Sequence, residues 1–232
     1  MTGIEPVGDA QVIAIDGPSG TGKSSVAREV ARRLGAGYLD TGAMYRAVTV
    51  AVLADGLDPA DTEAVADRSA RVTIDIATDP EIDSVYADGR DVTAVIRSAA
   101  VTAAVSAVSA VPAVRRRMVA AQRQLSLRST TVVEGRDIGS VVFPAARLKI
   151  YLTATPAARA ARRAEQLGLS DPLEVSALAE ALRVRDELDS TRVESPLRPA
   201  QDAVLIDSTD LSQEDVVEAI LAAVTSRSGR GC

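Results

Sequence analysis

The sequence predicts an α/β fold: a parallel five-stranded sheet covered by helices on both faces, with a small antiparallel β insert. Short β-branched apolar runs alternate with longer amphipathic segments, and the connections between the runs are long enough for crossovers. Near residue 74 the hydrophobic period changes to two, which adds the insert. A chain of 232 residues with 47% hydrophobic residues suits one domain of this class.

The parallel strands are expected where apolar, β-branched runs end in polar or glycine residues. They are predicted at 12–15, 38–39, 130–133, 148–152 and 203–206. Helices are expected where apolar residues recur at a helical spacing, or between a capping residue and a glycine or proline. They are predicted at 25–34, 44–53, 156–167, 173–188 and 213–224, with two more between 101 and 127 that Pro112 divides.

The insert is expected between residues 71 and 97. Ile74 and Ile76 alternate with polar residues, and Asp88 and Gly89 form a dipeptide typical of hairpin turns. A third strand is predicted at 92–96. A long loop is the alternative for this segment.

A glycine-rich stretch, GPSGTGKSS, joins the first strand to the first helix. Its glycines allow backbone amides to approach phosphate oxygens, and the positive end of the helix dipole adds to the anion cradle. Lys23 can then reach the terminal phosphates, and the Ser24 hydroxyl is placed to ligate Mg²⁺. The spacing therefore predicts a nucleotide-binding P-loop; a glycine-rich turn with an incidental lysine is the alternative. The predicted ATP-binding residues are Gly17, Pro18, Ser19, Gly20, Thr21, Gly22, Lys23, Ser24 and Ser25.

The composition excludes several functions. The chain has no histidine, so carboxylates, lysines, arginines and hydroxyls must perform any chemistry. A formal charge of −6 argues against a sequence-independent nucleic-acid binder. No apolar run reaches membrane-spanning length, and the only cysteine, Cys232, cannot form an intramolecular disulfide. We therefore expect a cytoplasmic protein that binds neither nucleic acid nor membrane.

Polar segments follow the predicted strands at the P-loop and at 40–46, 134–137 and 207–209. Because ligands bind outside the carboxyl ends of parallel strands, we expect these four segments to lie together at one edge of the sheet.

Five motifs follow one another along the chain: GPSGTGKSS, LDTGAMYR, EGRDIGSVVFP, RDELDSTR and SPLRPAQDAVLIDST. Together they resemble the bacterial-type cytidylate kinases of the nucleoside monophosphate kinase family. The insert after residue 71 is similar to one that the short eukaryotic-type kinases lack. The resemblance implies transfer of the γ-phosphoryl group of ATP to CMP or dCMP, with Mg²⁺.

The resemblance also assigns roles to individual residues. It implies that Thr41 and Arg46 lie at the acceptor nucleotide, that Arg136 and Arg185 clamp its phosphate, that Ser106, Arg115 and Asp137 read cytosine, and that Asp189 and Arg192 serve the sugar. The implied catalytic residues are Lys23, Arg136, Arg159, Arg163 and Arg185, and the predicted metal ligand is Ser24. Glu134 and Asp40 follow predicted strands and are candidates to hold metal-bound water, with a solvated strand-end carboxylate as the alternative for each.

The implied organisation is a mobile leader at 1–10, a single P-loop kinase domain at 11–224 and a frayed tail at 225–232. Within the domain, a nucleoside-monophosphate-binding region covers about 40–128, with the insert at about 71–97, and a helical lid covers about 156–172. We expect a monomer, because the acceptor and lid segments must move relative to the core.

Four alternatives compete with particular parts of this interpretation. Arg162 shares a helix face with Arg159 and Arg163 and is a candidate lid arginine, for which a solvated basic face is the alternative. An intrahelical ion-pair ladder is the alternative for Arg185, Asp189 and Arg192. A P-loop kinase for UMP, AMP or a shikimate-like acceptor is the nearest alternative function. A P-loop nucleotide switch is the more distant one.

Overall fold

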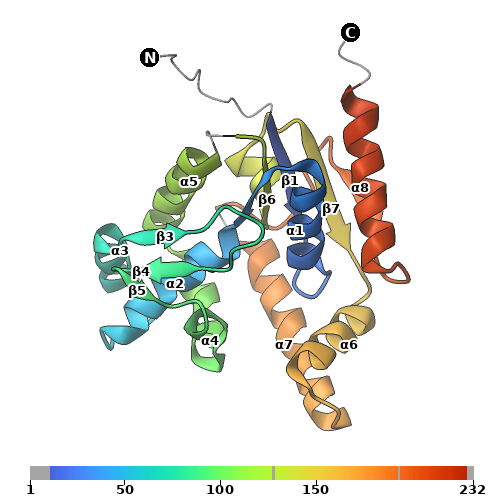
Figure 1. The fold of residues 1–232 in the computed structure, drawn as a ribbon. Coiled ribbons are helices and arrows are strands. Elements are labelled where there is room, and N and C mark those ends of the chain that lie inside the picture. Colours follow the sequence, from blue (N-terminus) through green and yellow to red (C-terminus); the bar gives the residue numbers. More distant parts are fainter. Residues whose placement is uncertain (1–10, 127–128, 193, 229–232) are drawn as a thin grey trace, which may run out of the picture.

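The computed structural model describes residues 11–126, 129–192 and 194–228 (Figure 1). The predicted leader at 1–10 and residues 229–232 of the predicted tail, which include Cys232, lie outside the described residues. Within the described part of the chain, no helix combines the length and the apolar character that crossing a membrane requires.

The predicted five-stranded parallel sheet is confirmed. Its strand order is β2-β6-β1-β7-β8, and all four neighbouring pairs are parallel. The strands are β1 (Val12–Asp16), β2 (Gly37–Asp40), β6 (Thr131–Gly135), β7 (Leu148–Thr153) and β8 (Val204–Asp207). The register places Asp16 opposite Gly135 and Asp40 opposite Glu134, so the polar ends of the three strands share one edge.

Helices cover both faces of the sheet because alternate residues of the buried strands point to opposite sides. Ile13 and Ile15 of β1 belong to a core cluster that includes residues of α1 and α8, whereas Val12 and Ala14 belong to one that includes residues of α2 and α5. The helices are α1 (Lys23–Leu34), α2 (Thr41–Ala54), α3 (Thr62–Arg71), α4 (Ala99–Ala110), α5 (Pro112–Ser126), α6 (Pro156–Leu167), α7 (Pro172–Thr191) and α8 (Gln213–Ser228).

The antiparallel insert is present as β3 (Ile74–Ile76), β4 (Val85–Ala87) and β5 (Arg90–Asp91), and Figure 1 shows it beside α3 and away from α8. Asp88 and Gly89 make the turn, both with positive φ. The third strand predicted at 92–96 was wrong, because it lies earlier, at Arg90–Asp91. The Thr93 hydroxyl accepts the Val85 amide at 2.9 Å, so a side chain takes the place of a strand partner.

Two helical segments differ from the prediction. Helix α3 was not anticipated; its cap is Asp61, whose carboxylate accepts the Glu63 and Ala64 amides. Helix α8 continues to Ser228, so fraying from 225 was wrong for its described residues. Arg227 holds this last turn by donating to the carbonyl oxygens of Arg147 and Asp202.

Candidate active site

The P-loop follows β1 and opens α1, as its sequence predicts. Gly17, Gly20 and Gly22 all have positive φ, at 148°, 81° and 86°. A Cβ on Gly17 would lie 2.1 Å from the Leu152 carbonyl oxygen of β7, so only glycine fits there. The loop is therefore packed directly against the sheet, with its conformation set by the glycines.

Lys23 folds back onto its own loop. Its Nζ donates to the Pro18 carbonyl oxygen at 2.6 Å, and the residue is buried. Burial, followed by the nearby Arg136, lowers the pKa of the Lys23 ammonium. Nζ also lies 3.5 Å from Thr21 Oγ1, so a phosphate group would compete only with neutral oxygens for this cation.

Ser24, Glu134 and Tyr38 form a hydrogen-bonded chain beside the P-loop. Ser24 Oγ donates to Glu134 Oε2 at 3.0 Å, and Tyr38 Oη donates to Glu134 Oε1 at 2.5 Å. Burial, reinforced by the charge of Asp40, raises the pKa of the Glu134 carboxyl.

A hydroxyl and a carboxylate side by side are oxygen donors of the kind that Mg²⁺ binds. Among the described residues, no three or more acidic, cysteine or histidine side chains cluster as a metal cage. Mg²⁺ usually binds through one or two protein oxygens with waters and substrate phosphates, so the residues present fit this ion. The Asp40 carboxylate is used differently, because it caps α2 by accepting the Ala43 amide at 2.9 Å.

Arg136 connects the P-loop to helix α7. Its guanidinium donates to the Gly17 carbonyl oxygen at 2.7 Å, to Ser19 Oγ at 2.6 Å and to Asp189 Oδ2 at 2.9 Å. Asp189 also lies 3.6 Å from Arg192 Nη1. Burial opposes ionisation of Asp189, but Arg136 and Arg192 outweigh it and hold the pKa of this carboxyl below its usual value.

Arg185 lies beside this group, within the electrostatic influence of two arginines, Arg136 and Arg46, and two carboxylates, Asp189 and Asp186. Burial, followed by the charge of Arg136, lowers the pKa of the Arg185 guanidinium to about 10. Its Nε is buried and makes no hydrogen bond to any described residue. Buried cations that exceed their carboxylate partners favour an anionic ligand such as a phosphate.

Arg115 of α5 and Asp137, in the turn after β6, form a buried pair. Arg115 Nη2 donates to Asp137 Oδ2 at 2.5 Å, and the two side chains are 4% and 6% exposed. The Tyr45 ring supports the guanidinium, with its centroid 5.4 Å from Arg115 Cζ. Arg115 also donates to the Ser109 carbonyl oxygen at 3.3 Å, on the same helix as the half-buried Ser106.

Thr41 and Arg46 have partners within the protein. Thr41 Oγ1 donates to the Glu134 carbonyl oxygen at 2.7 Å and so joins the start of α2 to β6. Arg46 Nη1 donates to the Ile96 carbonyl oxygen at 2.8 Å and to Thr102 Oγ1 at 2.9 Å. Burial lowers the pKa of Arg46.

The arginines of α6 have different environments. Arg159 is 8% exposed; it donates to the Ala154 and Ser19 carbonyl oxygens and pairs with Asp186 of α7. Among the residues that the structure describes, Arg163 donates only to Gln166 within its own helix. Arg159 is therefore part of the packing between α6, α7 and the P-loop, whereas Arg163 is the freer of the two.

Three further residues at this edge have contacts that the sequence did not predict. Arg162 is not on a solvated face, because it donates to the carbonyl oxygens of Ser208 and Thr209. Asp16 accepts the Ile138 and Gly139 amides at 2.8 Å each. Burial raises the pKa of Asp16 to about 6, against the lowering effect of those two hydrogen bonds. The third residue, Tyr38, was predicted only as part of a strand.

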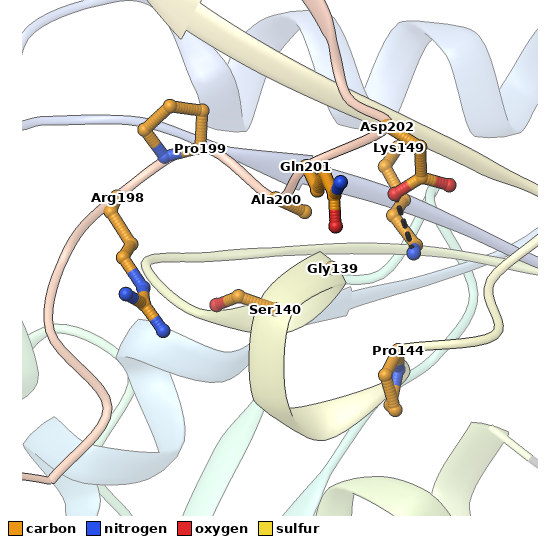
Figure 2. Close-up of a pocket in the computed structure, with 9 residues that line it drawn as sticks. All are labelled: Gly139, Ser140, Pro144, Lys149, Arg198, Pro199, Ala200, Gln201 and Asp202. Atoms are coloured by element: carbon orange, nitrogen blue, oxygen red, sulfur yellow. Dashed lines mark hydrogen bonds and ion pairs between the residues drawn. The ribbon is translucent and has the colours of Figure 1, made fainter.

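A cavity of about 440 Å³ lies between the turn at Ile138–Val142, the start of β7 and residues 198–202 (Figure 2). Lys149 and Asp202 lie side by side in its lining and pair at 2.8 Å, and Arg198 and Ser140 also line it. None of its lining residues is among the predicted nucleotide or acceptor residues. The candidate active site is therefore the P-loop edge of the sheet.

Comparisons with known proteins agree with this geometry. A family model described as Cytidylate kinase matches residues 13–226. The cytidylate kinase of Rhodococcus opacus (strain B4) is 55% identical over 222 residues, covering 95% of this chain and 97% of that protein. The cytidylate kinase of Streptomyces griseus subsp. griseus is 47% identical over 228 residues, covering 97% of each.

Among solved structures, a gluconokinase from Sinorhizobium meliloti 1021 matches with a TM-score of 0.50 at 16% identity, covering 95% of this chain and 93% of that one. This likeness concerns the fold alone. The family model spans the P-loop, the arginines of α6 and α7, and the buried Arg115–Asp137 pair. Because this model and the relatives cover nearly the whole chain, the chain belongs to the cytidylate kinase family.

Proposed function

We propose that this kinase transfers the γ-phosphoryl group of ATP to CMP and dCMP, giving ADP with CDP or dCDP. The observation that carries the proposal is the buried ion pair of Arg115 and Asp137, which lies on the acceptor side of a P-loop edge rich in arginine. A nucleotide switch has no use for such an acceptor site.

The Arg115–Asp137 pair matches the edge of cytosine. The base offers an exocyclic amino donor beside ring acceptors, so Asp137 can accept from the amino group while Arg115 donates to the acceptors. Uracil would turn a carbonyl toward the Asp137 carboxylate. Because both side chains are buried, the mismatch would leave polar groups unsatisfied, which is the kind of penalty that gives strong discrimination. Ser106 is proposed as the third base-reading residue.

The phosphates would bind between the P-loop and α7. The backbone amides of residues 17–25 and Lys23 would hold the phosphates of ATP. Arg136 and Arg185 would hold the acceptor phosphate, and Asp189 with Arg192 would bind the sugar. Arg136 already touches both Ser19 of the P-loop and Asp189 of α7, so one guanidinium can align donor and acceptor.

The reaction needs no general base. The attacking group is a phosphate oxygen that is ionised at neutral pH, so positioning and charge stabilisation supply most of the catalysis. Arg163 and Arg159 of the proposed lid, residues 156–172, would stabilise charge on the phosphoryl oxygens and exclude water on closure. The proposed acceptor region, residues 40–128, would carry Thr41 and Arg46 to the acceptor nucleotide.

We propose Mg²⁺ as the required metal. Ser24 would hold it directly, and Glu134 would hold its water; a bound Mg²⁺ neutralises charge on the transferring phosphates. With the Ser24 proton directed at Glu134, the lone pairs of its hydroxyl are free to face a cation.

The first test is ADP formation from ATP and Mg²⁺ with CMP, dCMP, UMP, AMP and GMP offered in turn. We expect strong turnover with CMP and dCMP and weak turnover with UMP. The Asp137→Ala variant should lose most of its preference for cytosine over uracil. ATP hydrolysis that is equal with and without every acceptor would favour the nucleotide switch, and preferred use of UMP or AMP would favour another acceptor.

A further inference from the structure

We infer that Tyr38 is a positioning residue for the proposed magnesium site, acting by fixing the Glu134 carboxylate through its hydroxyl. The inference rests on the proposed function, because it assigns Ser24 and Glu134 to the metal. It adds a residue from β2 whose sequence position gave no sign of such a role.

The contact between Tyr38 and Glu134 is short and buried. Tyr38 Oη donates to Glu134 Oε1 at 2.5 Å, and the two residues are 3% and 4% exposed. Burial, followed by the charges of Glu134 and Asp40, raises the pKa of the phenol, so the hydroxyl stays a donor. A charge-assisted bond of this length fixes the orientation of the carboxylate.

The orientation of Glu134 in turn determines that of Ser24. Glu134 Oε2 accepts the Ser24 hydroxyl at 3.0 Å while Oε1 accepts Tyr38. A hydroxyl has one proton and two lone pairs, so a proton committed to Glu134 leaves the lone pairs of Ser24 available to a cation. Without Tyr38, the carboxylate can rotate and Oε1 loses its only direct hydrogen-bond donor among the described residues.

Tyr38 is itself held in place from the other side. Its amide donates to the Thr78 carbonyl oxygen at 2.8 Å, and the Arg28 guanidinium lies 4.7 Å from its ring centroid. Arg28 donates in turn to the Pro80 carbonyl oxygen at 3.1 Å and to Asp83 at 3.3 Å. The loop between β3 and β4 therefore supports the tyrosine ring from outside the metal site.

The test is Tyr38→Phe, which keeps the ring and removes only the hydroxyl. Partners in the outer shell of a metal site typically change metal affinity by about 10-fold or more. We therefore expect the Mg²⁺ concentration for half-maximal rate to rise about tenfold, with the KM for CMP unchanged. Tyr86→Phe is the matched control, because Tyr86 is an exposed tyrosine of the insert, and its Mg²⁺ dependence should equal that of the wild type.

Calorimetry of ADP binding, with and without Mg²⁺, provides a readout that does not depend on turnover. Binding without Mg²⁺ should be equal in the wild type and Tyr38→Phe, and the gain in affinity on adding Mg²⁺ should shrink about tenfold in the variant. An unchanged gain would overturn the inference even if the variant is less stable. A wild type that does not phosphorylate CMP would overturn the proposed function instead, and the ADP measurement would still decide the role of Tyr38.

A double-mutant cycle tests whether Tyr38 acts through Glu134. In the Glu134→Gln variant, the partner that Tyr38 orients is already changed. Adding Tyr38→Phe to it should therefore reduce the gain in ADP affinity on adding Mg²⁺ by less than a further twofold. If the double variant instead loses the product of the two single-variant reductions in Mg²⁺-dependent affinity, Tyr38 acts independently of Glu134, and the inference is overturned.

Discussion

Arg115 donates to Asp137 at 2.5 Å although the two side chains come from α5 and from the turn after β6. Each neutralises the other inside the protein, so neither charge is left bare before an acceptor binds. The pair is also a fixed donor beside a fixed acceptor. A ligand that replaces this contact must offer the complementary pattern, which is why the pair can select a base.

The first prediction concerns Arg115→Lys. A lysine ammonium is a point charge without the planar fork of arginine, so the buried Asp137 loses its matched partner. We expect kcat/KM for CMP to fall about 10–100-fold, because one imperfect buried hydrogen bond costs about 1–3 kcal/mol. Steady-state kinetics with CMP check this. Arg116→Lys, at an exposed neighbouring position, should leave kcat/KM unchanged.

The sheet and the P-loop could be predicted from sequence because both depend on local patterns. Apolar β-branched runs gave every parallel strand, and the spacing of Gly17, Gly20 and Gly22 gave the loop. Helix α3 was not predicted because Thr62–Arg71 is largely polar and Val65 is its only buried apolar residue. The third strand of the insert was misplaced because a side chain, Thr93, satisfies the Val85 amide.

Side-chain partners across the fold could not be predicted, since they depend on packing between distant segments. Tyr38 and Glu134 are 96 residues apart in the chain, and no periodicity links them. The burial of Arg159 against Asp186 likewise follows from how α6 packs on α7. The motif resemblance suggests a role for Arg159 but none for Tyr38 or Asp186, and only the fold gives their contacts.

The second prediction compares two P-loop glycines. In Gly17→Ala the new Cβ would lie 2.1 Å from the Leu152 carbonyl oxygen, so β7 and the loop must separate. We expect the free energy of unfolding to fall by about 3 kcal/mol or more. Gly22→Ala meets no atom within 4 Å and carries only the strain of its positive φ, about 1–2 kcal/mol. Urea unfolding of both variants measures the difference; equal losses would contradict the steric argument.

The third prediction concerns the pH dependence that Asp16 confers. Its pKa is about 6 in the folded protein against an ordinary value of 3.8, so the folded state holds this proton more tightly. The resulting stabilisation is fully present below pH 3.8 and is lost as the pH rises through about 6. Asp16→Asn cannot titrate. The unfolding free energy of the wild type relative to this variant should therefore fall by up to about 3 kcal/mol as the pH rises from 4 to 7.

Urea unfolding of both proteins at several pH values between 4 and 7 measures this difference. The comparison cancels the titration of all other carboxyl groups, several of which have lowered pKa values and act in the opposite direction. A difference between wild type and Asp16→Asn that does not change with pH would contradict the prediction.

The fourth prediction is that Arg185→Met has opposite effects on stability and on function. Burial and the charge of Arg136 lower the pKa of Arg185 to about 10, which means that the charged guanidinium lowers the free energy of unfolding. Removing it should raise the free energy of unfolding of the ligand-free protein by about 1–3 kcal/mol. The acceptor phosphate then loses a charge-assisted partner, and the KM for CMP should rise about tenfold or more.

The matched control is Arg183→Met on the same helix. Arg183 is exposed, and within the described part of the chain it pairs only with Glu180 and Glu187, so neither the stability nor the KM for CMP should change measurably. Urea unfolding and steady-state kinetics on both variants decide the matter. A loss of stability in Arg185→Met would mean that Asp189 and Asp186 already compensate the cation in full, and the positive excess proposed to attract the acceptor phosphate would not exist.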